Sequence, residues 1–419
     1  MHEGTARTLS IRPLRDFLAT EAAGGVAVVA GAVLALAWAN SPWQASYERL
    51  WTTVFQLRLG SLSLALDLRH WVNEALMTIF FLVVGLEIKR EVVEGELRNP
   101  RHRMLPVSAA LGGMILPALL FTVFNLGRPE IRGWAIPMAT DIALAVGVLA
   151  VVGSKVRPSL KLFLLALAIV DDIGAILVIA LVYASNVEWV WLLVALAFVG
   201  ITIVARGKVT TIPVYLVLGT GVWFAFHVAG IHATLAGVVM GLLAPTKPHI
   251  PPEQIDQTEL TNLDSVQEVL TTRRLARSTV SVVEWLENRL HRWTSFLIVP
   301  LFALANAGIP LSAEALSGAV TAPVAWGIVV GLVVGKPLGI IVATAIAVRS
   351  RVAALPAGVT WNGVVGAGLL AGMGFTVSVF IAELALMPPL TQYAKVGILT
   401  ASIVSGALGF IVLRRVASR

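Results

Sequence analysis

Four charged residues lie in the middle of long apolar stretches of the sequence: Asp141, Asp171, Asp172 and Lys336. Asp171 and Asp172 are adjacent within LFLLALAIVDDIGAILVIALVYA (162–184), which has no other charge. A charge at the centre of a lone membrane helix costs ~2.5–3.5 kcal/mol. One Asp–Lys ion pair would be a purely structural arrangement, but three carboxylates against one ammonium leave surplus negative charge. The set therefore favours a functional site.

The adjacent aspartates could bind a cation and exchange it for a proton. Successive helical residues point ~100° apart, so one carboxylate can face a cavity while the other faces a neighbouring helix, where Lys336 is a candidate partner. Two carboxylates this close repel each other at low dielectric constant, so one holds a proton part of the time near neutral pH. When ionised, it offers the oxygen ligands that hard cations prefer. Protons and a cation that compete for one site, opened to each side of a membrane in turn, give antiport.

The composition predicts an all-α membrane protein with a single polytopic domain (1–419). The chain is 57% apolar and 13% charged, about half the ~25% charged content of a soluble domain. Apolar runs of ~20 residues recur, long enough to cross a bilayer as helices, and they lack the alternation of a barrel. There are no cysteines for a disulfide or a thiolate metal site. We expect about 12 transmembrane helices, at 22–40, 70–88, 104–125, 133–152, 160–184, 188–205, 212–228, 231–246, 293–309, 322–348, 358–384 and 392–413.

The first apolar run, GGVAVVAGAVLALAWANS (24–41), is similar to a signal peptide, with AWA at 37–39 as a cleavage site. The basic segment before it is long, about twenty residues, and contains Asp16 and Glu21. This favours a retained first helix over a cleaved one.

The basic residues follow the expected topology. The N-terminal segment and the loops after even-numbered spans carry most of the Lys and Arg, whereas the loops after odd-numbered spans carry only Arg49, Arg58, Arg69, Arg128 and Arg132. The positive-inside rule then puts both termini in the cytoplasm. The net charge of +7 is thereby explained without a nucleic-acid partner.

Two loops have a predicted structure of their own. TTVFQLRLGSLSLALDL (52–68) alternates apolar and polar residues around Gly60, which predicts an external β-hairpin. An isolated hairpin is marginal in water, so pairing with a second copy is expected to make a homodimer. The polar stretch 247–291 is expected to be a cytoplasmic linker with an interfacial helix in its second half.

Spans 3–5 and 10–12 form two three-helix units of opposite orientation, an inverted repeat. Their middle members, spans 4 and 11, are predicted to be discontinuous, because they contain AIPMATDIALA (135–145) and the glycine-rich GAGLLAGMGFTVS (366–378). Broken spans at matching places in inverted halves indicate a midplane site in a secondary transporter. Their half-helix ends carry partial charges, which Asp141 and Lys336 are suited to neutralise.

The sequence resembles the NhaA family of sodium/proton antiporters over nearly its whole length. The motifs that carry the resemblance are FFLVVGLEIKREVVEGEL (80–97), ATDIALAVGVLA (139–150), LAIVDDIGAI (167–176), GIHATLAGV (230–238), PLFALANAG (300–308), GKPLGI (335–340) and GLLAGMGFTVSVFI (368–381). The resemblance implies a secondary transporter without a cofactor, not an enzyme: an electrogenic exchanger of cytoplasmic Na⁺ and Li⁺ for external H⁺ in a bacterial inner membrane, which serves sodium and pH homeostasis.

The resemblance also implies roles for individual residues. Asp172 would be the cation ligand, and Asp171 a co-ligand or the partner of Lys336. Asp141 and Lys336 would balance the half-helices, with Thr140 nearby. Whether Asp171 or Lys336 carries a second proton stays open.

The family's regulation by pH points to Glu87, Arg90, Glu91, Glu287 and His291. The first three share one helix face by their spacing, and without the resemblance they would pass for an ordinary charged helix end. Asn288 stands where a second histidine is expected, which leaves the activation pH open.

Two enzyme classes also use paired aspartates in membranes. An intramembrane aspartyl protease needs them on separate helices with a Gly-x-Gly-Asp pattern, which this sequence lacks. A prenyltransferase would use Asp-Asp-x-x-Asp to hold Mg²⁺, and Ala175 stands at the last position. A sodium channel would not need a midplane lysine.

Overall fold

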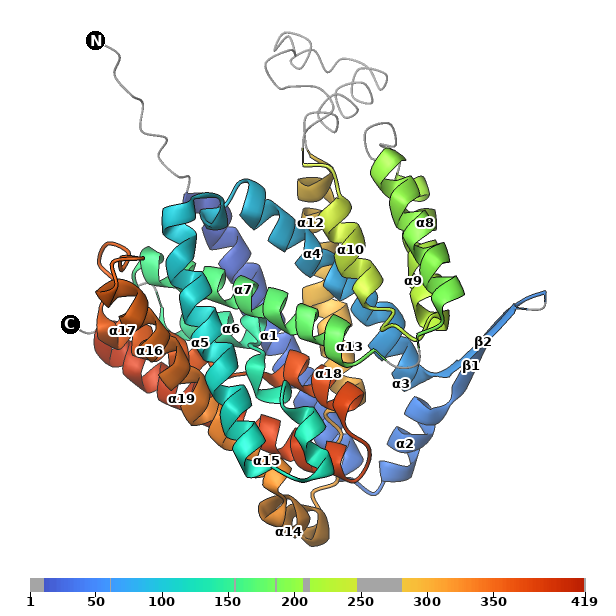
Figure 1. The fold of residues 1–419 in the computed structure, drawn as a ribbon. Coiled ribbons are helices and arrows are strands. Elements are labelled where there is room, and N and C mark those ends of the chain that lie inside the picture. Colours follow the sequence, from blue (N-terminus) through green and yellow to red (C-terminus); the bar gives the residue numbers. More distant parts are fainter. Residues whose placement is uncertain are drawn as a thin grey trace, which may run out of the picture.

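The chain folds into long helices, two of which are broken in mid-course, and one small hairpin (Figure 1). The computed structural model describes residues 11–60, 62–153, 156–184, 187–205, 212–246 and 281–417. The helices are α1 (Ile11–Ala39), α2 (Gln44–Thr52), α3 (Leu68–Trp71), α4 (Met77–Val93), α5 (Pro100–Phe124), α6 (Ile142–Val152), α7 (Pro158–Val182), α8 (Trp189–Ala205), α9 (Ile212–Val228), α10 (Leu235–Leu243), α12 (Val282–Trp293), α13 (Val299–Asn306), α14 (Ala313–Thr321), α15 (Pro323–Val330), α16 (Lys336–Arg349), α17 (Trp361–Ala371), α18 (Phe375–Ala385) and α19 (Leu390–Ala417).

Every predicted span has a helical counterpart, and the described residues contain six helices that are long and apolar enough to cross a membrane. Two bent helix pairs, Pro129–Met138 with α6 and α17 with α18, would raise this number to eight. Several tryptophans near helix ends are exposed, Trp43 by 73% and Trp293 by 58% among them, as is usual where a helix leaves the bilayer. The fold is that of a multi-pass membrane protein.

The helix α7 passes through the middle of the molecule. It begins at Pro158, whose fixed φ suits the first helical position. In its most apolar 18-residue stretch, 61% is buried inside the protein. The corresponding share for the other five long helices is 39–50%. This central helix carries Asp171 and Asp172, so the two carboxylates are surrounded by protein rather than by lipid.

The two broken helices are bent at the predicted places. The helical segment Pro129–Met138 and α6 meet at 41°, and α17 and α18 meet at 44°. The first break follows Pro137, and Asp141 then adopts an extended conformation as the N-cap of α6. The second break lies at Gly372–Gly374, where a Cβ at position 374 would lie 2.9 Å from the carbonyl oxygen of Ala139. Glycine is required there because the two breaks touch.

Lys336 follows a wide π turn, Gly331–Gly335, that joins α15 to α16. Pro337 has no N–H to continue the regular helical pattern, and such turns often mark functional sites. α16 packs along α5, where a Cβ on Gly112 would lie only 2.2 Å from the carbonyl oxygen of Gly339. Small residues thus bring the two backbones close and hold Lys336 in the interior.

Two paired strands occupy the place where sequence alternation predicts a hairpin. β1 (Val54–Leu59) and β2 (Leu62–Asp67) are antiparallel, with Val54 opposite Asp67 and Leu59 opposite Leu62. They project from the helices at the right of Figure 1.

The predicted linker 247–291 lies outside the described residues up to position 280. The helix after it begins at Val282, where Ser281 accepts a hydrogen bond from the N–H of Glu284 at 3.1 Å. It begins well before the predicted ninth span because α12 runs on through a π turn, Thr294–Ile298, into α13.

One end of the molecule holds the starts of α1, α5, α7, α12 and α17, and the opposite end holds α14 (Figure 1). We call the first the basic end, because Arg103, Arg157, Arg349 and Arg351 lie there.

Candidate functional site

The two helix breaks cross in the centre of the protein and are joined by hydrogen bonds. The backbone N–H of Asp141 donates to the carbonyl oxygen of Met373 at 2.6 Å. The Thr140 hydroxyl oxygen lies 3.0 Å from the carbonyl oxygen of Ala371, and the Ser378 hydroxyl donates to the carbonyl oxygen of Ile136 at 2.8 Å. The carbonyl groups that each break removes from its own helix thus find partners in the other break.

Asp141 caps two half-helices at once. One carboxylate oxygen accepts from the N–H of Leu144 at 3.1 Å, in the first turn of α6. The other accepts from the N–H and the hydroxyl of Thr376, at 3.0 and 2.7 Å, in the first turn of α18. Both helix N-termini carry partial positive charge. A single buried carboxylate, 2% exposed, therefore compensates both.

Lys336 compensates the opposite kind of helix end. Its ammonium group donates to the carbonyl oxygen of Met138, which ends the half-helix before the first break. It also forms an ion pair with Asp171 at 2.5 Å, and the Thr140 hydroxyl donates to the same carboxylate oxygen at 2.6 Å. Lys336 is 0% and Asp171 1% exposed, so this ion pair has no contact with solvent.

The two adjacent aspartates have different surroundings, as the helical rotation between neighbours predicts. Asp171 is engaged by Lys336 and Thr140. Asp172 instead lines a cavity of about 50 Å³ together with Thr140, Asp141 and Thr376. Asp172 is thus the carboxylate that faces the cavity, and Asp171 is the one that pairs with Lys336.

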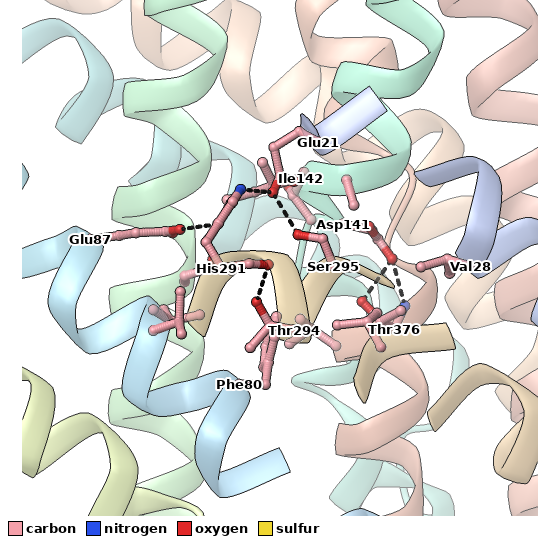
Figure 2. A pocket seen from close by; sticks show the side chains of 17 residues that line it. Glu21, Val28, Phe80, Glu87, Asp141, Ile142, His291, Thr294, Ser295 and Thr376 are labelled. Atoms are coloured by element: carbon pink, nitrogen blue, oxygen red, sulfur yellow. Dashed lines mark hydrogen bonds and ion pairs between the residues drawn. The ribbon is translucent and has the colours of Figure 1, made fainter. Parts of the chain in front are cut away.

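The far wall of the same cavity is a second group of ionisable side chains, on α1, α4 and α12 (Figure 2). The His291 ring lies between two carboxylates, with Nε2 at 3.0 Å from Glu21 and Nδ1 at 3.4 Å from Glu87. The Ser295 hydroxyl donates to the same oxygen of Glu21 at 3.3 Å. With a carboxylate beside each ring nitrogen, the imidazole is placed to form ion pairs on both sides as a cation.

The pKa values of this second group separate a fixed charge from a titrating one. Burial lowers the pKa of His291, but the hydrogen bonds and charges of Glu21 and Glu87 outweigh it and raise the pKa to about 10. Burial raises the pKa of Glu287 to about 7, against the opposing charge of Arg90, with which Glu287 forms an ion pair. Glu287 does not line the cavity but interacts electrostatically with Glu87 and His291, and it is the residue that changes charge near neutral pH.

Glu21 belongs to this group but was not predicted as a site residue, whereas Glu91 was predicted and does not line the cavity. Glu21 served only as an argument against a signal peptide, yet it is 8% exposed and holds His291. An acidic residue at the start of a membrane helix was the available signal. The carboxylate of Glu91 lies against Gly95, at the end of α4.

Among the described residues, no three His, Asp or Glu side chains form a metal-binding group. The lining of the cavity at Asp172 also includes the hydroxyl-bearing Thr140 and Thr376.

Comparison with known proteins assigns the family. The model of the Na+/H+ antiporter 1 family matches residues 15–413. The chain belongs to this family. Among curated members, Na(+)/H(+) antiporter NhaA 2 of Syntrophotalea carbinolica is 43% identical over 97% of each chain. Na(+)/H(+) antiporter NhaA 2 of Sorangium cellulosum is 45% identical over 96% of this chain and 90% of its own.

Na(+)/H(+) antiporter NhaA of Rhizobium meliloti is 41% identical over 96% of this chain and 94% of its own. The matches run through the whole chain, so the crossing and the cavity both lie in the region shared with the NhaA relatives.

Proposed function

We propose that the protein is a secondary antiporter that exchanges cytoplasmic Na⁺ for external H⁺ by alternating access. The observation that carries the proposal is the unequal environment of the two aspartates. Asp172 reaches a cavity, while Asp171 beside it is engaged by Lys336. The family and the name shared by the relatives, Na(+)/H(+) antiporter, support the choice of ions.

The mechanism follows from competition for one carboxylate. Asp172 binds either a proton or Na⁺, because each neutralises the charge that its buried surroundings disfavour. The crossed half-helices and their counter-charges, Asp141 and Lys336, surround the site and would open to each side of the membrane in turn. Release of Na⁺ on one side then requires a proton from the same side.

Electrogenic exchange requires a second proton for each Na⁺. The Asp171–Lys336 ion pair is the available carrier, because it adjoins Asp172 and titrates as a unit with it. Li⁺, a smaller and harder cation of the same charge, is expected to be a second substrate.

Regulation by pH is proposed for the second group together with the adjacent Glu287–Arg90 ion pair, which does not line the cavity. At pH 6 Glu287 is largely neutral and at pH 8 largely ionised, since its pKa is about 7. Ionisation completes the ion pair with Arg90 and ties α12 to α4. His291, with a pKa of about 10, remains a cation throughout and fixes Glu21 and Glu87.

Location and assembly are proposed from the sequence pattern. The basic end is assigned to the cytoplasm of a bacterial inner membrane, with both termini inside. The hairpin, whose strands are largely exposed, would pair with that of a second copy.

Everted membrane vesicles with a fluorescent pH probe test the proposal. Addition of Na⁺ or Li⁺ should collapse the proton gradient and K⁺ should not, with activity rising from pH 6 to pH 9. The same membranes should neither cleave a labelled transmembrane peptide nor consume a labelled prenyl pyrophosphate. The family assignment likewise does not favour these enzymes. A gradient that Na⁺ leaves intact would contradict the exchange.

A further inference from the structure

A second, larger cavity opens at the basic end, apart from the ion site. Its volume is about 980 Å³, at the upper limit of pockets that hold small organic ligands. The first turns of α5 and α7, the end of α16 and the loop after it form its walls. The lining is mainly apolar, through Leu105, Leu162, Phe163, Val348, Val352 and Leu355.

The charges around this cavity favour an anion. His102 and Arg351 line it, and among its described lining residues none is Asp or Glu. The N-terminus of α7 lies beside it, where the Arg157 side chain makes no capping hydrogen bond. A helix N-terminus adds partial positive charge. A ligand with an anionic head and an apolar body matches both features.

Arg351 has the backbone conformation that glycine normally supplies. Its φ is 59°, and no other non-glycine residue among those described has a positive φ. It follows the end of α16, and the N–H groups of Val352 and Ala353 both donate to the carbonyl oxygen of Ala347 at 3.1 Å. Glycine is usual at such helix ends because a Cβ is disfavoured there. An arginine at this position suggests that the guanidinium group itself is used.

The loop that carries Arg351 is fastened to α7. The Ser159 hydroxyl donates to the carbonyl oxygen of Ala357 at 3.0 Å. Gly358 lies against the guanidinium of Arg157, where a Cβ would be 2.2 Å from Nη1. The cavity is therefore a feature of the folded helices rather than of a loose surface loop.

We propose that this cavity binds an anionic phospholipid from the leaflet at the basic end. The phosphate would be held by Arg351, whose planar fork matches phosphate oxygens, and the His102 ring would offer a hydrogen-bond donor. An acyl chain would lie against Phe163 and Leu355. Basic pockets between transmembrane helices suit such headgroups, and the apolar walls favour a lipid over a free phosphate. The lipid would join the ends of α5, α7 and α16, outside the ion path.

Purified full-length protein in detergent tests the proposal. Phosphatidylglycerol should raise the melting temperature in a saturable way, because a ligand that binds only the folded state stabilises it. Phosphatidylcholine should do so far less, and inorganic phosphate should have no effect. An equal response to inorganic phosphate would identify a free-anion site and overturn the proposal. An equal response to phosphatidylcholine, or no response to any lipid, would also overturn it.

Three variants locate the effect. Arg351→Gln should weaken phosphatidylglycerol binding by at least about tenfold, whereas Arg292→Gln, which removes an exposed arginine of α12 at the same end, should not. Arg351→Gly should melt at an equal or higher temperature than the parent without lipid, since glycine accepts the positive φ, and should lose the lipid response. Equal losses for Arg351→Gln and Arg292→Gln would show a diffuse charge effect and refute the site.

A cavity-filling variant supplies an independent check. Val352 is 51% exposed in the loop, so Val352→Trp is compatible with the fold and keeps Arg351. It should exclude the acyl chain and reduce the lipid response. An unchanged response would place the lipid elsewhere.

Discussion

Two groups of buried charges share the walls of one small cavity, and they are neutralised in different ways. At the crossing, side-chain charges face backbone: Asp141 caps two helix N-termini, and Lys336 donates to the carbonyl oxygen of Met138. In the second group, side chains face side chains across helices, as His291 does with Glu21 and Glu87.

The difference predicts different behaviour. A charge matched to a helix end is fixed for as long as the break exists, and at the crossing Lys336 is fully buried. An ion pair between two intact helices can form and break. The Arg90 side chain of the Arg90–Glu287 pair is 38% exposed, so it can separate from its partner and be solvated. We therefore expect substitutions at the crossing to abolish exchange or folding, and substitutions in the second group to shift its pH dependence.

The largest expected effect is at Asp172. Asp172→Asn keeps the shape of the side chain but removes its charge and its proton. Na⁺-dependent proton movement in everted vesicles should fall to background, more than the roughly 10–100-fold loss seen when an outer-shell partner of a metal site is removed. Glu314→Gln, at an exposed position of α14, is the control. A folded Asn variant with near-normal exchange would mean that Asp172 is not the ligand.

Lys336 separates structural from transport roles. Lys336→Ala strands Asp171 in the interior, and breaking a buried pair costs about 3–5 kcal/mol, so the melting temperature should fall strongly. Lys395→Ala is a matched control. It breaks the Lys395–Glu383 pair, also at 2.5 Å but with the two side chains 10% and 26% exposed. The glutamate left behind can reach solvent, so the melting temperature should fall less than it does for Lys336→Ala.

Lys336→Arg completes this test. It keeps the charge but cannot deprotonate in the working range, so it should recover stability better than the proton stoichiometry. Voltage dependence of exchange in proteoliposomes measures the latter. Unchanged electrogenicity in the Arg variant would exclude Lys336 as a proton carrier, and an Ala variant as stable as the parent would remove its structural role.

The crossing could be anticipated from the sequence because its features are local. Pro137 and the glycines at 372 and 374 mark the breaks. Charged residues within apolar runs mark the side chains that neutralise the helix ends at these breaks. Which helix end each charge would meet depends on how the two breaks cross, a long-range contact that no local pattern encodes. The double capping by Asp141 is such a contact.

The second group was harder to predict because its contacts join three helices distant in sequence. The spacing of Glu87, Arg90 and Glu91 gave one face of α4. It could not show that Glu21 of α1 would reach the same histidine. The continuity of α12 with α13 was equally hidden, because no turn signal separates or joins a charged amphipathic segment and the apolar helix that follows it through a π turn.

Glu287→Gln should change pH dependence rather than abolish exchange. The variant cannot ionise, so the rise in activity between pH 6 and 8 should flatten. The parent's raised pKa, from 4.5 to about 7, means that its folded state holds the extra proton between these values. The stability from this group is complete below pH 4.5, declines by at most about 1.4 kcal/mol per pH unit, and is lost above pH 7.

Melting curves from pH 5 to 8 measure this decline. The parent's melting temperature should fall relative to the Gln variant up to pH 7, and the two should then run parallel. Glu284→Gln, at an exposed position one turn earlier, should behave as the parent does. If Glu287→Gln leaves both profiles unchanged, the second group is as fixed as the crossing, and the contrast between the two fails.

The smallest effect on exchange is expected from the hairpin, because both charge groups lie within one chain. Deletion of residues 54–66 should leave a folded protein, since the cut ends are already close: the N–H of Leu68 donates to the carbonyl oxygen of Thr53 at 3.0 Å. Asp67, which caps α3 through the N–H of His70, is retained. Light scattering in detergent should show a monomer where the parent is a dimer, with exchange in proteoliposomes close to normal. A well-folded monomer without exchange would mean that a second copy completes the ion path, and neither charge group could then be interpreted from one chain alone.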